Sequence, residues 1–272
     1  CTSDVPDHWI MQLPRLSAKA FEDLRAGHLE DIRDIPDGSG LTAPQELIRN
    51  SVLSNQQWIS SGLKDALLST EGTIYFLDFE TFNPAVPVYK GTRPYELVPF
   101  QWSCHVKAKG EVLHHADFLA KSFEDPRRAF AESLIAQLEN SGPVVVYSGF
   151  ESWVIRDLEA LYSDLSEELQ AIRVRIWDLF GVIKKNYYHP GFHGSYSIKS
   201  VVPVLVPELA YTDIDVQSGD GAATAFQKLA NNPGLDPIER ERIELQLRDY
   251  CARDTLAMVK ILEYLTKVAD SI

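Results

Sequence analysis

Residues 74–80, Ile-Tyr-Phe-Leu-Asp-Phe-Glu, decide the fold class of this chain. The apolar run from Ile74 to Leu77 predicts a buried strand, because strands covered on both faces are apolar almost throughout. Asp78 and Glu80 end this run and point to the same face, since strand side chains alternate. Two carboxylates there predict a shared divalent cation at the sheet edge, where open α/β folds bind ligands. The alternative is a loop that begins at Asp78 and leaves Glu80 exposed.

A third acid, Asp254, lies within the apolar stripe of a long helix that we expect from about Pro237 to Val268. A carboxylate that faces a core costs several kcal/mol unless it is paired or binds a metal. Tyr250 precedes Asp254 by four residues, the spacing that places two side chains on one helix face. We therefore expect both to face the acids of the first strand. The rest of the stripe is Ile243, Leu247, Cys251, Met258, Ile261 and Leu265.

A fourth candidate acid, Glu151, closes the motif Tyr147-Ser148-Gly149-Phe150-Glu151, which follows a short apolar strand and opens a helix. A strand, a tight turn and a helix would bring Glu151 to the same edge of the sheet. The alternative is that Glu151 only interacts with the helix dipole, which contributes about 0.3–1 kcal/mol. Asp157, two turns later, competes for the role, and we expect it on the solvated face of the helix.

The order of elements predicts a mixed sheet covered by helices. Strands are expected at 73–79, 100–107, 112–118, 143–147 and 173–179, with the second and third joined as a hairpin. Helices are expected at 124–139, 151–162, 197–202 and 221–231, besides the C-terminal helix. Residues 1–70 read as a helical segment with helices that begin after Ser17 and Thr42 and a third helix over 57–68. We predict two parts: a helical segment, 1–70, and an α/β domain with a five-stranded mixed sheet, 71–272.

The composition is that of a globular protein, since the 272 residues are 45% hydrophobic and 24% charged. No apolar run approaches the roughly 20 residues of a membrane span, so no membrane partner is expected. The net charge of −13 argues against a broad basic surface that coats nucleic acid. It is compatible with an acidic metal centre. Cys1, Cys104 and Cys251 give neither a disulfide framework nor zinc-ligand spacing, which favours a reducing compartment, the cytoplasm.

Three short motifs resemble those of the DEDD 3′–5′ exonucleases, which have a ribonuclease H-like fold. Asp78-Phe79-Glu80-Thr81 is similar to their first motif, and Tyr250-x-x-x-Asp254 is similar to the third motif of their tyrosine subclass. Ser148-Gly149-Phe150-Glu151 resembles the second motif, with Ser148 where the family usually has Asn and Glu151 where it usually has Asp. The resemblance covers roughly residues 72–266.

Two further segments resemble an uncharacterised bacterial domain family of this superfamily. They are Val98-Pro99-Phe100-Gln101-Trp102-Ser103 and Ser197-Ile198-Lys199-Ser200-Val201-Val202-Pro203. Members of that family often follow a RecB-like PD-(D/E)XK nuclease domain with an iron–sulfur cluster. The resemblance implies that residues 1–70 are the tail of such an upstream domain, with Cys1 as a stray cluster ligand or a free thiol.

The resemblance also implies a centre of two Mg²⁺ or Mn²⁺ ions, which prefer oxygen ligands. Two cations about 3.5–4 Å apart can stabilise the attacking and leaving oxygens of a phosphodiester together. In this arrangement Asp78 bridges both ions, and Glu80 and Asp254 share one of them. Glu151 supports the other ion, partly through water, and Tyr250 positions or helps deprotonate the attacking water. The expected substrate-binding residues are Thr81, Phe82, Phe150 and Lys199.

The expected activity is metal-dependent 3′–5′ hydrolysis of single-stranded DNA or RNA, or of a frayed 3′ end. One alternative is a catalytically weak or inactive nucleic-acid-binding module that keeps the fold, which the departures at Ser148 and Glu151 favour. Acids in apolar elements oppose it, because without a ligand they would only destabilise the fold. A structure-selective endonuclease that shares the site is the other alternative.

Overall fold

The computed structural model describes residues 5–67, 72–108, 110–121, 124–138, 141–210, 218–232 and 234–271. The chain forms two compact units. The first comprises Cys1–Leu67, Phe180–Glu208 and Thr266–Ile272, and the second comprises Leu68–Leu179 and Leu209–Leu265. The division into residues 1–70 and 71–272 stays a prediction, and the first unit also takes in segments far beyond residue 70. No helix in the described ranges is long and apolar enough to cross a membrane.

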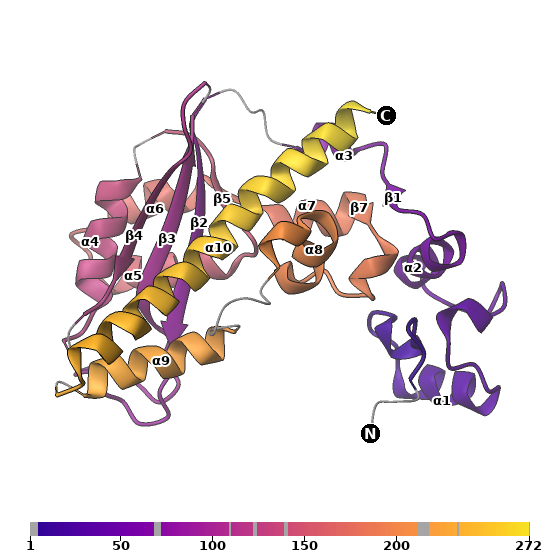
Figure 1. The fold of residues 1–272 in the computed structure, drawn as a ribbon, viewed down its shortest axis with the longest axis horizontal. Coiled ribbons are helices and arrows are strands. Elements are labelled where there is room, and N and C mark those ends of the chain that lie inside the picture. Colours follow the sequence, from indigo (N-terminus) through magenta and orange to yellow (C-terminus); the bar gives the residue numbers. More distant parts are fainter. Residues whose placement is uncertain are drawn as a thin grey trace. The chain divides into compact units, whose positions relative to one another are not determined.

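The N-terminal part of the first unit consists of short helices, and two of them begin where the sequence predicts (Figure 1). Helix α1 spans Ala18–Ala26, and the Ser17 hydroxyl accepts a hydrogen bond from a backbone N–H in its first turn. Helix α2 spans Ala43–Ser54 and starts with a capping box at Thr42, which satisfies backbone donors that a helix start leaves unpaired. Two 3₁₀ turns complete this part, η1 (Ile10–Gln12) and η2 (Ile32–Asp34).

The predicted third helix over 57–68 is wrong. Trp58–Ile59 forms strand β1, which pairs antiparallel with β7, Tyr187–Tyr188. Among residues 57–67, which the structure describes, only the four-residue helix α3, Leu63–Ala66, is helical, and Gly62 stands at its start. Aromatic and β-branched residues suit strand pairing, and a glycine inside a helix is unfavourable. These local preferences outweigh the helical pattern that we inferred.

The remainder of the first unit packs aromatic rings around the fully buried Phe192. The ring centroids of Tyr187, Tyr188 and Tyr196 lie 6.0, 5.8 and 6.2 Å from that of Phe192. The pairs with Tyr188 and Tyr196 are edge-to-face and the pair with Tyr187 is tilted, and edge-to-face packing stabilises a core beyond the area that it buries. The helical elements here are α7 (Leu179–Asn186), η3 (Pro190–Phe192), α8 (Ile198–Leu205) and η4 (Pro207–Leu209). The sequence predicted α8 and missed α7.

The second unit contains a five-stranded mixed sheet, which confirms this part of the predicted fold class. The strand order is β4-β3-β2-β5-β6, in which β4, β3 and β2 are antiparallel neighbours and β2, β5 and β6 run parallel. The predicted hairpin is the pair β3–β4. The strands are β2 (Ile74–Phe82), β3 (Val98–Lys107), β4 (His114–Leu119), β5 (Val144–Val146) and β6 (Ile176–Asp178).

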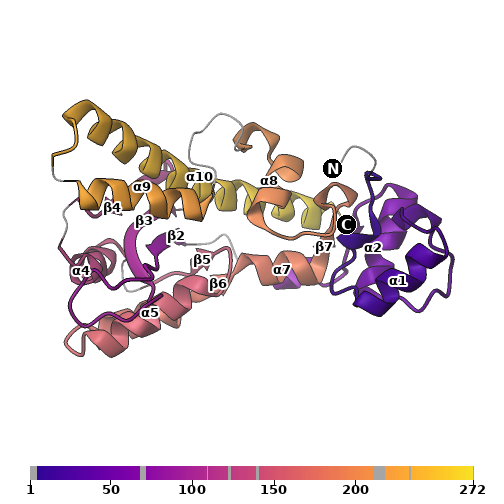
Figure 2. The same cartoon turned by 90° about the horizontal axis from the view of Figure 1, so that it is seen from below.

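Helices cover both faces of this sheet, with α9 and α10 on one face and α4 and α5 on the other (Figure 2). The C-terminal helix α10 is continuous and closely matches its predicted bounds. The predicted strand at 173–179 is wrong in its first half, because helix α6 precedes a shorter strand. The buried pair Leu169 and Ile172 gives α6 an apolar face at helical spacing. The helices are α4 (Arg127–Gln137), α5 (Phe150–Leu161), α6 (Ser166–Arg173), α9 (Gly219–Asn231) and α10 (Pro237–Asp270).

The alternation of side chains on β2 separates an apolar face from a polar one. Tyr75, Leu77 and Phe79 belong to the core cluster that packs against α4, α5 and α6. Asp78 and Glu80 point to the opposite face, since successive strand residues alternate. They pair in register with Ser103 and Gln101 of β3. We call these four residues, with His105 of β3, the polar strip of the sheet. A strand can therefore be buried and still carry two acids, because they share one face.

The polar strip is in direct contact with helix α10. Gln101 Nε2 donates a hydrogen bond to Leu247 O at 2.8 Å, and the Ser103 and Thr255 hydroxyls lie 2.9 Å apart. His105 Nδ1 lies 2.8 Å from the same Thr255 hydroxyl. Hydrogen bonds between buried polar groups favour one packing arrangement, although Gln101 Oε1 has no hydrogen-bond partner among the described residues. These contacts fix the position of α10 along β3, and therefore of the residues that precede Thr255.

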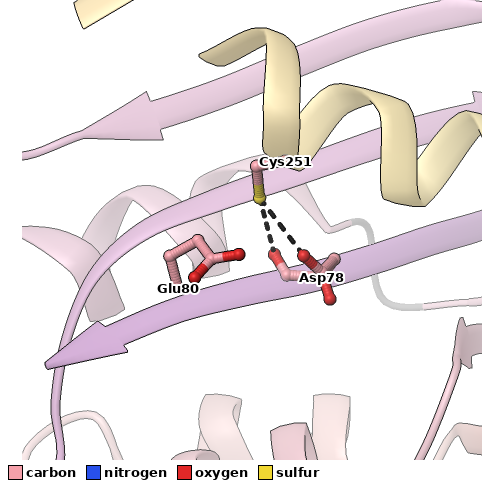
Figure 3. A group of neighbouring side chains, drawn as sticks. All are labelled: Asp78, Glu80 and Cys251. Atoms are coloured by element: carbon pink, nitrogen blue, oxygen red, sulfur yellow. Dashed lines mark hydrogen bonds between the residues drawn. The ribbon is translucent and has the colours of Figure 1, made fainter. Parts of the chain in front are cut away.

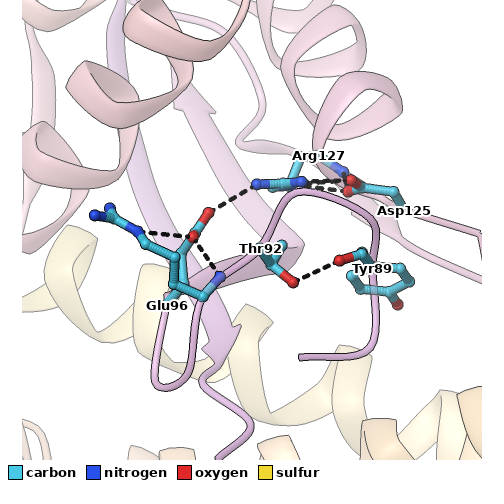
Figure 4. Close-up of polar contacts among 6 residues, drawn as sticks. Tyr89, Thr92, Glu96, Asp125 and Arg127 are labelled. Atoms are coloured by element: carbon cyan, nitrogen blue, oxygen red, sulfur yellow. Dashed lines mark hydrogen bonds and ion pairs between the residues drawn. The ribbon is translucent and has the colours of Figure 1, made fainter. Parts of the chain in front are cut away.

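The connection between β2 and β3 is anchored by a buried arginine (Figure 4). The Arg127 guanidinium donates to Asp125 Oδ2 at 2.6 Å and to Glu96 Oε1 at 2.9 Å, and only 6% of Arg127 is exposed. A buried charge of this kind is tolerated when it is paired and hydrogen-bonded. Within the same connection, Thr92 Oγ1 donates to Tyr89 O at 2.7 Å. The chain that follows Glu80 is thus held to the start of α4.

Candidate metal centre

Asp78, Glu80 and Cys251 form a three-residue cluster that can hold a metal ion (Figure 3). One ligand atom from each lies within 4.8 Å of the others. The acids come from adjacent positions of one face of β2, and the thiol comes from α10. Glu80 is 6% exposed and Cys251 is fully buried, whereas Asp78 is half-buried. The cluster therefore has one member that solvent reaches directly.

The Cys251 thiol is a hydrogen-bond donor to the acid beside it. Cys251 Sγ lies 3.4 Å from Asp78 Oδ2 and 3.8 Å from Asp78 O. Burial raises the pKa of this thiol well above its usual range, and the nearby Asp78 raises it further. A protonated thiol is a poor metal ligand, because the thiolate is the ligating form. Cys251 therefore suits an orienting role toward Asp78, and oxygen atoms are the main donors of the cluster.

Asp254 and Tyr250 extend the cluster along α10, as the sequence predicts. Asp254 is 7% exposed and Tyr250 is 4% exposed. Burial raises the pKa of Asp78 well above its usual range, and the charges of Asp254, Glu80 and Glu151 raise it further. Burial also raises the pKa of the Tyr250 hydroxyl, with added contributions from Asp254 and Glu80. The three other acids thus lie close enough to act on Asp78, and two of them, with Asp78, also act on Tyr250.

Glu151 is the most enclosed of the four acids. It stands in the first turn of α5, is 4% exposed, and its Oε2 has no hydrogen-bond partner among the described residues. Burial raises its pKa from an ordinary value of 4.5 to about 8, and the charge of Asp178 adds to the rise. Glu151 and Asp254 stand outside the closest three-residue cluster. They border it on the sides of α5 and α10.

The donor set fits a hard divalent cation. No lysine or arginine in the described ranges forms an ion pair with Asp78 or Glu151. Burial without such an ion pair disfavours the ionised forms of Asp78 and Glu151, and a bound cation would reverse that preference. Carboxylate oxygens suit Mg²⁺, Ca²⁺ or Mn²⁺ more than the softer ions that thiolates select. Cys251 is the one thiol in the cluster, and its raised pKa favours the protonated form, which binds soft metal ions less well than a thiolate does.

The predicted substrate-binding residues lie in different surroundings. Thr81 is half-buried and directly follows a shift in the register between β2 and β3. Phe82 is 3% exposed, and its ring lies 5.2 Å from that of Phe226, which leaves it little surface for a nucleobase. Phe150 is partly buried against the core under α4 and α5. Lys199 is exposed on α8 and belongs to the first unit. Their roles stay predictions.

Two features of the centre were not assigned from the sequence. Cys251 was placed only in the apolar stripe of the last helix, although its i, i+3 spacing to Asp254 indicates a shared face. The supporting contacts of Thr255 with Ser103 and His105 join residues about 150 positions apart. No periodicity within one element reveals such contacts.

The two other cysteines lie outside this centre or outside the described residues. Cys104 is buried with a raised pKa, and Cys1 lies outside the described residues.

Comparison with family models finds a match to part of the chain. Residues 75–197 match the model of a domain of unknown function, DUF2779. The matched stretch contains Asp78, Glu80 and Glu151, and ends before Tyr250 and Asp254. No curated protein and no solved structure matches the chain.

Proposed function

We propose that this protein is a metal-dependent nuclease of the DEDD type, tyrosine subclass, with a ribonuclease H-like fold. The observation that carries the proposal is the convergence of Asp78, Glu80, Glu151 and Asp254 with Tyr250 at one place. These residues come from β2, from the start of α5 and from α10. They stand in the three motifs on which the resemblance rests, in the expected order along the chain.

The architecture supports the proposal at a coarser level. The five-stranded mixed sheet flanked by helices is the sheet expected of that fold. Glu80 lies near the carboxyl end of β2, and Glu151 follows the carboxyl end of β5, the edge at which open α/β sheets bind ligands. Two layers of helices leave that edge as the place for an extended substrate.

In the proposed reaction, Asp78, Glu80, Asp254 and Glu151 would hold two Mg²⁺ or Mn²⁺ ions. When bound, such ions activate water and neutralise charge on the phosphodiester oxygens. The Tyr250 hydroxyl keeps its proton, because burial and the neighbouring acids raise its pKa. It therefore serves as a hydrogen-bond donor that orients water or a phosphate oxygen, and it is not the base. Asp78 is held in place by the Cys251 thiol, which leaves its second oxygen free to bind.

A digestion assay tests the proposal. Single-stranded DNA and RNA, labelled at the 5′ or the 3′ end, are incubated with Mn²⁺ and the wild-type chain, Asp78→Asn or Tyr250→Phe. We expect stepwise shortening from the 3′ end, abolished in Asp78→Asn and reduced in Tyr250→Phe. The matched control is Asp157→Asn, which removes an exposed acid of α5 and keeps wild-type activity. Equal activity in all four proteins would remove this site from consideration, and internal cuts would indicate the endonuclease alternative.

A non-catalytic nucleic-acid-binding module is the second candidate. The observation in its favour is Glu151, whose pKa of about 8 keeps much of its carboxyl neutral near pH 7 when no cation is present. Binding of the labelled strands without any shortening, unchanged in Asp78→Asn, would support this candidate over the nuclease.

A further inference from the structure

We infer that the side-chain oxygen of Gln101 is an additional ligand of the metal centre, on the side of Glu80. The inference rests on the proposed metal-dependent function and deepens it, because none of the three exonuclease-like motifs contains Gln101. This residue lies in the segment Val98-Pro99-Phe100-Gln101-Trp102-Ser103, which the proposed reaction leaves without a role. Its side chain is fully buried in strand β3.

The Gln101 amide is hydrogen-bonded at one end only. Its Nε2 donates to Leu247 O of α10 at 2.8 Å, so the amide cannot be turned over without setting one oxygen against another. Its Oε1 is buried and has no hydrogen-bond partner among the described residues. Burying such an acceptor is costly unless something binds it. A ligand at this oxygen would therefore stabilise the fold.

A second buried glutamine shows the fully paired state of the same side chain. Gln45 is 5% exposed, and its Nε2 also donates to a backbone carbonyl, Pro14 O, at 2.9 Å. Its Oε1 accepts a hydrogen bond from the Thr42 N–H at 2.9 Å. Both ends of the Gln45 amide are thus satisfied, whereas Gln101 keeps one acceptor for a ligand. Gln45 belongs to the first unit and is a matched control for Gln101.

Strand register places Gln101 directly opposite Glu80, on the face that carries the acids. The two residues pair across the antiparallel strands β3 and β2, and opposite residues of such a pair share one face of the sheet. Helix α10 contacts this face at both places. Its Leu247 carbonyl accepts from Gln101, and one helical turn later Cys251 contacts Asp78. Gln101 therefore lies beside the centre that Asp78 and Glu80 form.

The spacing and the local backbone suit one shared ion. Directly opposite side chains have Cβ atoms about 4.5–5.5 Å apart. Two oxygens that bind one cation, each about 2.0–2.6 Å from it, lie at most about 4–5 Å apart. The register shifts directly after this pair, since Thr81 pairs with Pro99 and Phe100 is left over in β3. Bulges of this kind often lie next to functional sites and redirect a side chain. Glu80 and Gln101 can therefore reach the same ion.

A neutral oxygen suits the charge of this centre. Asp78, Glu80 and Asp254 already supply three carboxylates, and neighbouring like charges disfavour the ionised forms. An amide oxygen is a hard donor of the kind that Mg²⁺, Mn²⁺ and Ca²⁺ bind, and it adds no negative charge. The ion that Glu80 and Asp254 share thus gains a ligand from β3. A buried water molecule is the competing occupant of this oxygen.

Mn²⁺ binding measured by calorimetry on the full chain tests the inference. Gln101→Met keeps the length of the side chain and removes its oxygen, so it should weaken one site by at least about tenfold, the loss that even indirect partners of a metal site produce. Gln101→Glu restores an oxygen at the same place and should bind that ion at least as tightly as the wild type does. Gln45→Met, which removes a fully paired glutamine from the first unit, should bind Mn²⁺ with wild-type affinity.

A second measurement needs no variant and therefore stands even if Gln101→Met does not fold. Wild-type crystals soaked in Mn²⁺ should show an anomalous peak about 2.0–2.6 Å from Gln101 Oε1. A peak beside Glu80, with only a water molecule on Gln101 Oε1, would overturn the inference and leave the proposed nuclease intact. Wild-type affinity in folded Gln101→Met would do the same. Equal losses in Gln101→Met and Gln101→Glu would also overturn it, because the amide would then act only through packing. A wild-type chain that binds no Mn²⁺ would overturn the inference and the proposed function together.

Discussion

Replacing Glu151 by glutamine should change how the stability of the metal-free protein depends on pH. Glu151 is 4% exposed, and burial and Asp178 raise its pKa from 4.5 to about 8. A raised carboxyl pKa means that the folded state binds a proton that the unfolded state has already released. Glu151 therefore leaves stability unaffected below pH 4.5 and lowers it progressively as the pH rises from 4.5 to about 8. Glutamine has nearly the same shape and does not titrate.

The size of this effect follows from the shift in pKa. A rise from 4.5 to about 8 corresponds to an upper limit of about 5 kcal/mol, of which about 3 kcal/mol falls between pH 5 and pH 8. Water penetration and mutual adjustment of the acids reduce the measured value. We expect Glu151→Gln to gain at least about 1 kcal/mol relative to the wild type over that interval.

Urea unfolding in EDTA at pH 5 and at pH 8 provides the assay. The difference between the two pH values cancels any constant cost of a buried amide in Glu151→Gln. The other acids titrate in both proteins, so the comparison reports on Glu151 together with its effect on the pKa of Asp78. Free energies of unfolding that fall in parallel for the two proteins would refute the reasoning, because Glu151 would then titrate normally in the folded state.

Three further outcomes follow from the same geometry. Thr255→Val should lower the free energy of unfolding, measured in urea titrations, by about 2–4 kcal/mol, because Ser103 and His105 lose a buried hydrogen-bond partner. Thr255→Ser keeps the hydroxyl and should retain most of the wild-type free energy of unfolding. Cys251→Ser should keep Mn²⁺ affinity in calorimetry, because a hydroxyl can still donate to Asp78; a large loss would make the thiol a ligand. Mn²⁺ should raise the melting temperature more at pH 8 than at pH 6, because the carboxyl ligands must be deprotonated to bind it. An equal rise at both pH values would contradict the raised pKa values of these carboxyl groups.

The sequence predicted those elements whose patterns are strong within one segment. The apolar run before Asp78, the hairpin that follows it and the apolar stripe around Asp254 are all clear patterns in the sequence, and each forms the expected element. Strand β1, Trp58–Ile59, was not predicted, because its partner strand, Tyr187–Tyr188, lies far along the chain. Helix α7 was missed because its apolar residues follow β6 without a break.

The candidate site could be predicted because burial of a carboxylate is visible as a break in an apolar pattern. Asp78, Glu80 and Asp254 each interrupt such a pattern, and all three lie at the centre. Cys251 gave no such signal, since a cysteine fits within an apolar stripe. Its contact with Asp78 depends on the packing of α10 against β2, which no single segment encodes.

The central claim is that acids from β2, α5 and α10 together bind metal ions. Crystals of the chain soaked in Mn²⁺ and measured for anomalous scattering test it most directly. We predict two peaks about 3.5–4 Å apart, one contacting Asp78, Glu80 and Asp254 and the other lying toward Glu151. Well-diffracting crystals in which Mn²⁺ binds elsewhere, with no peak beside Asp78, would contradict the claim.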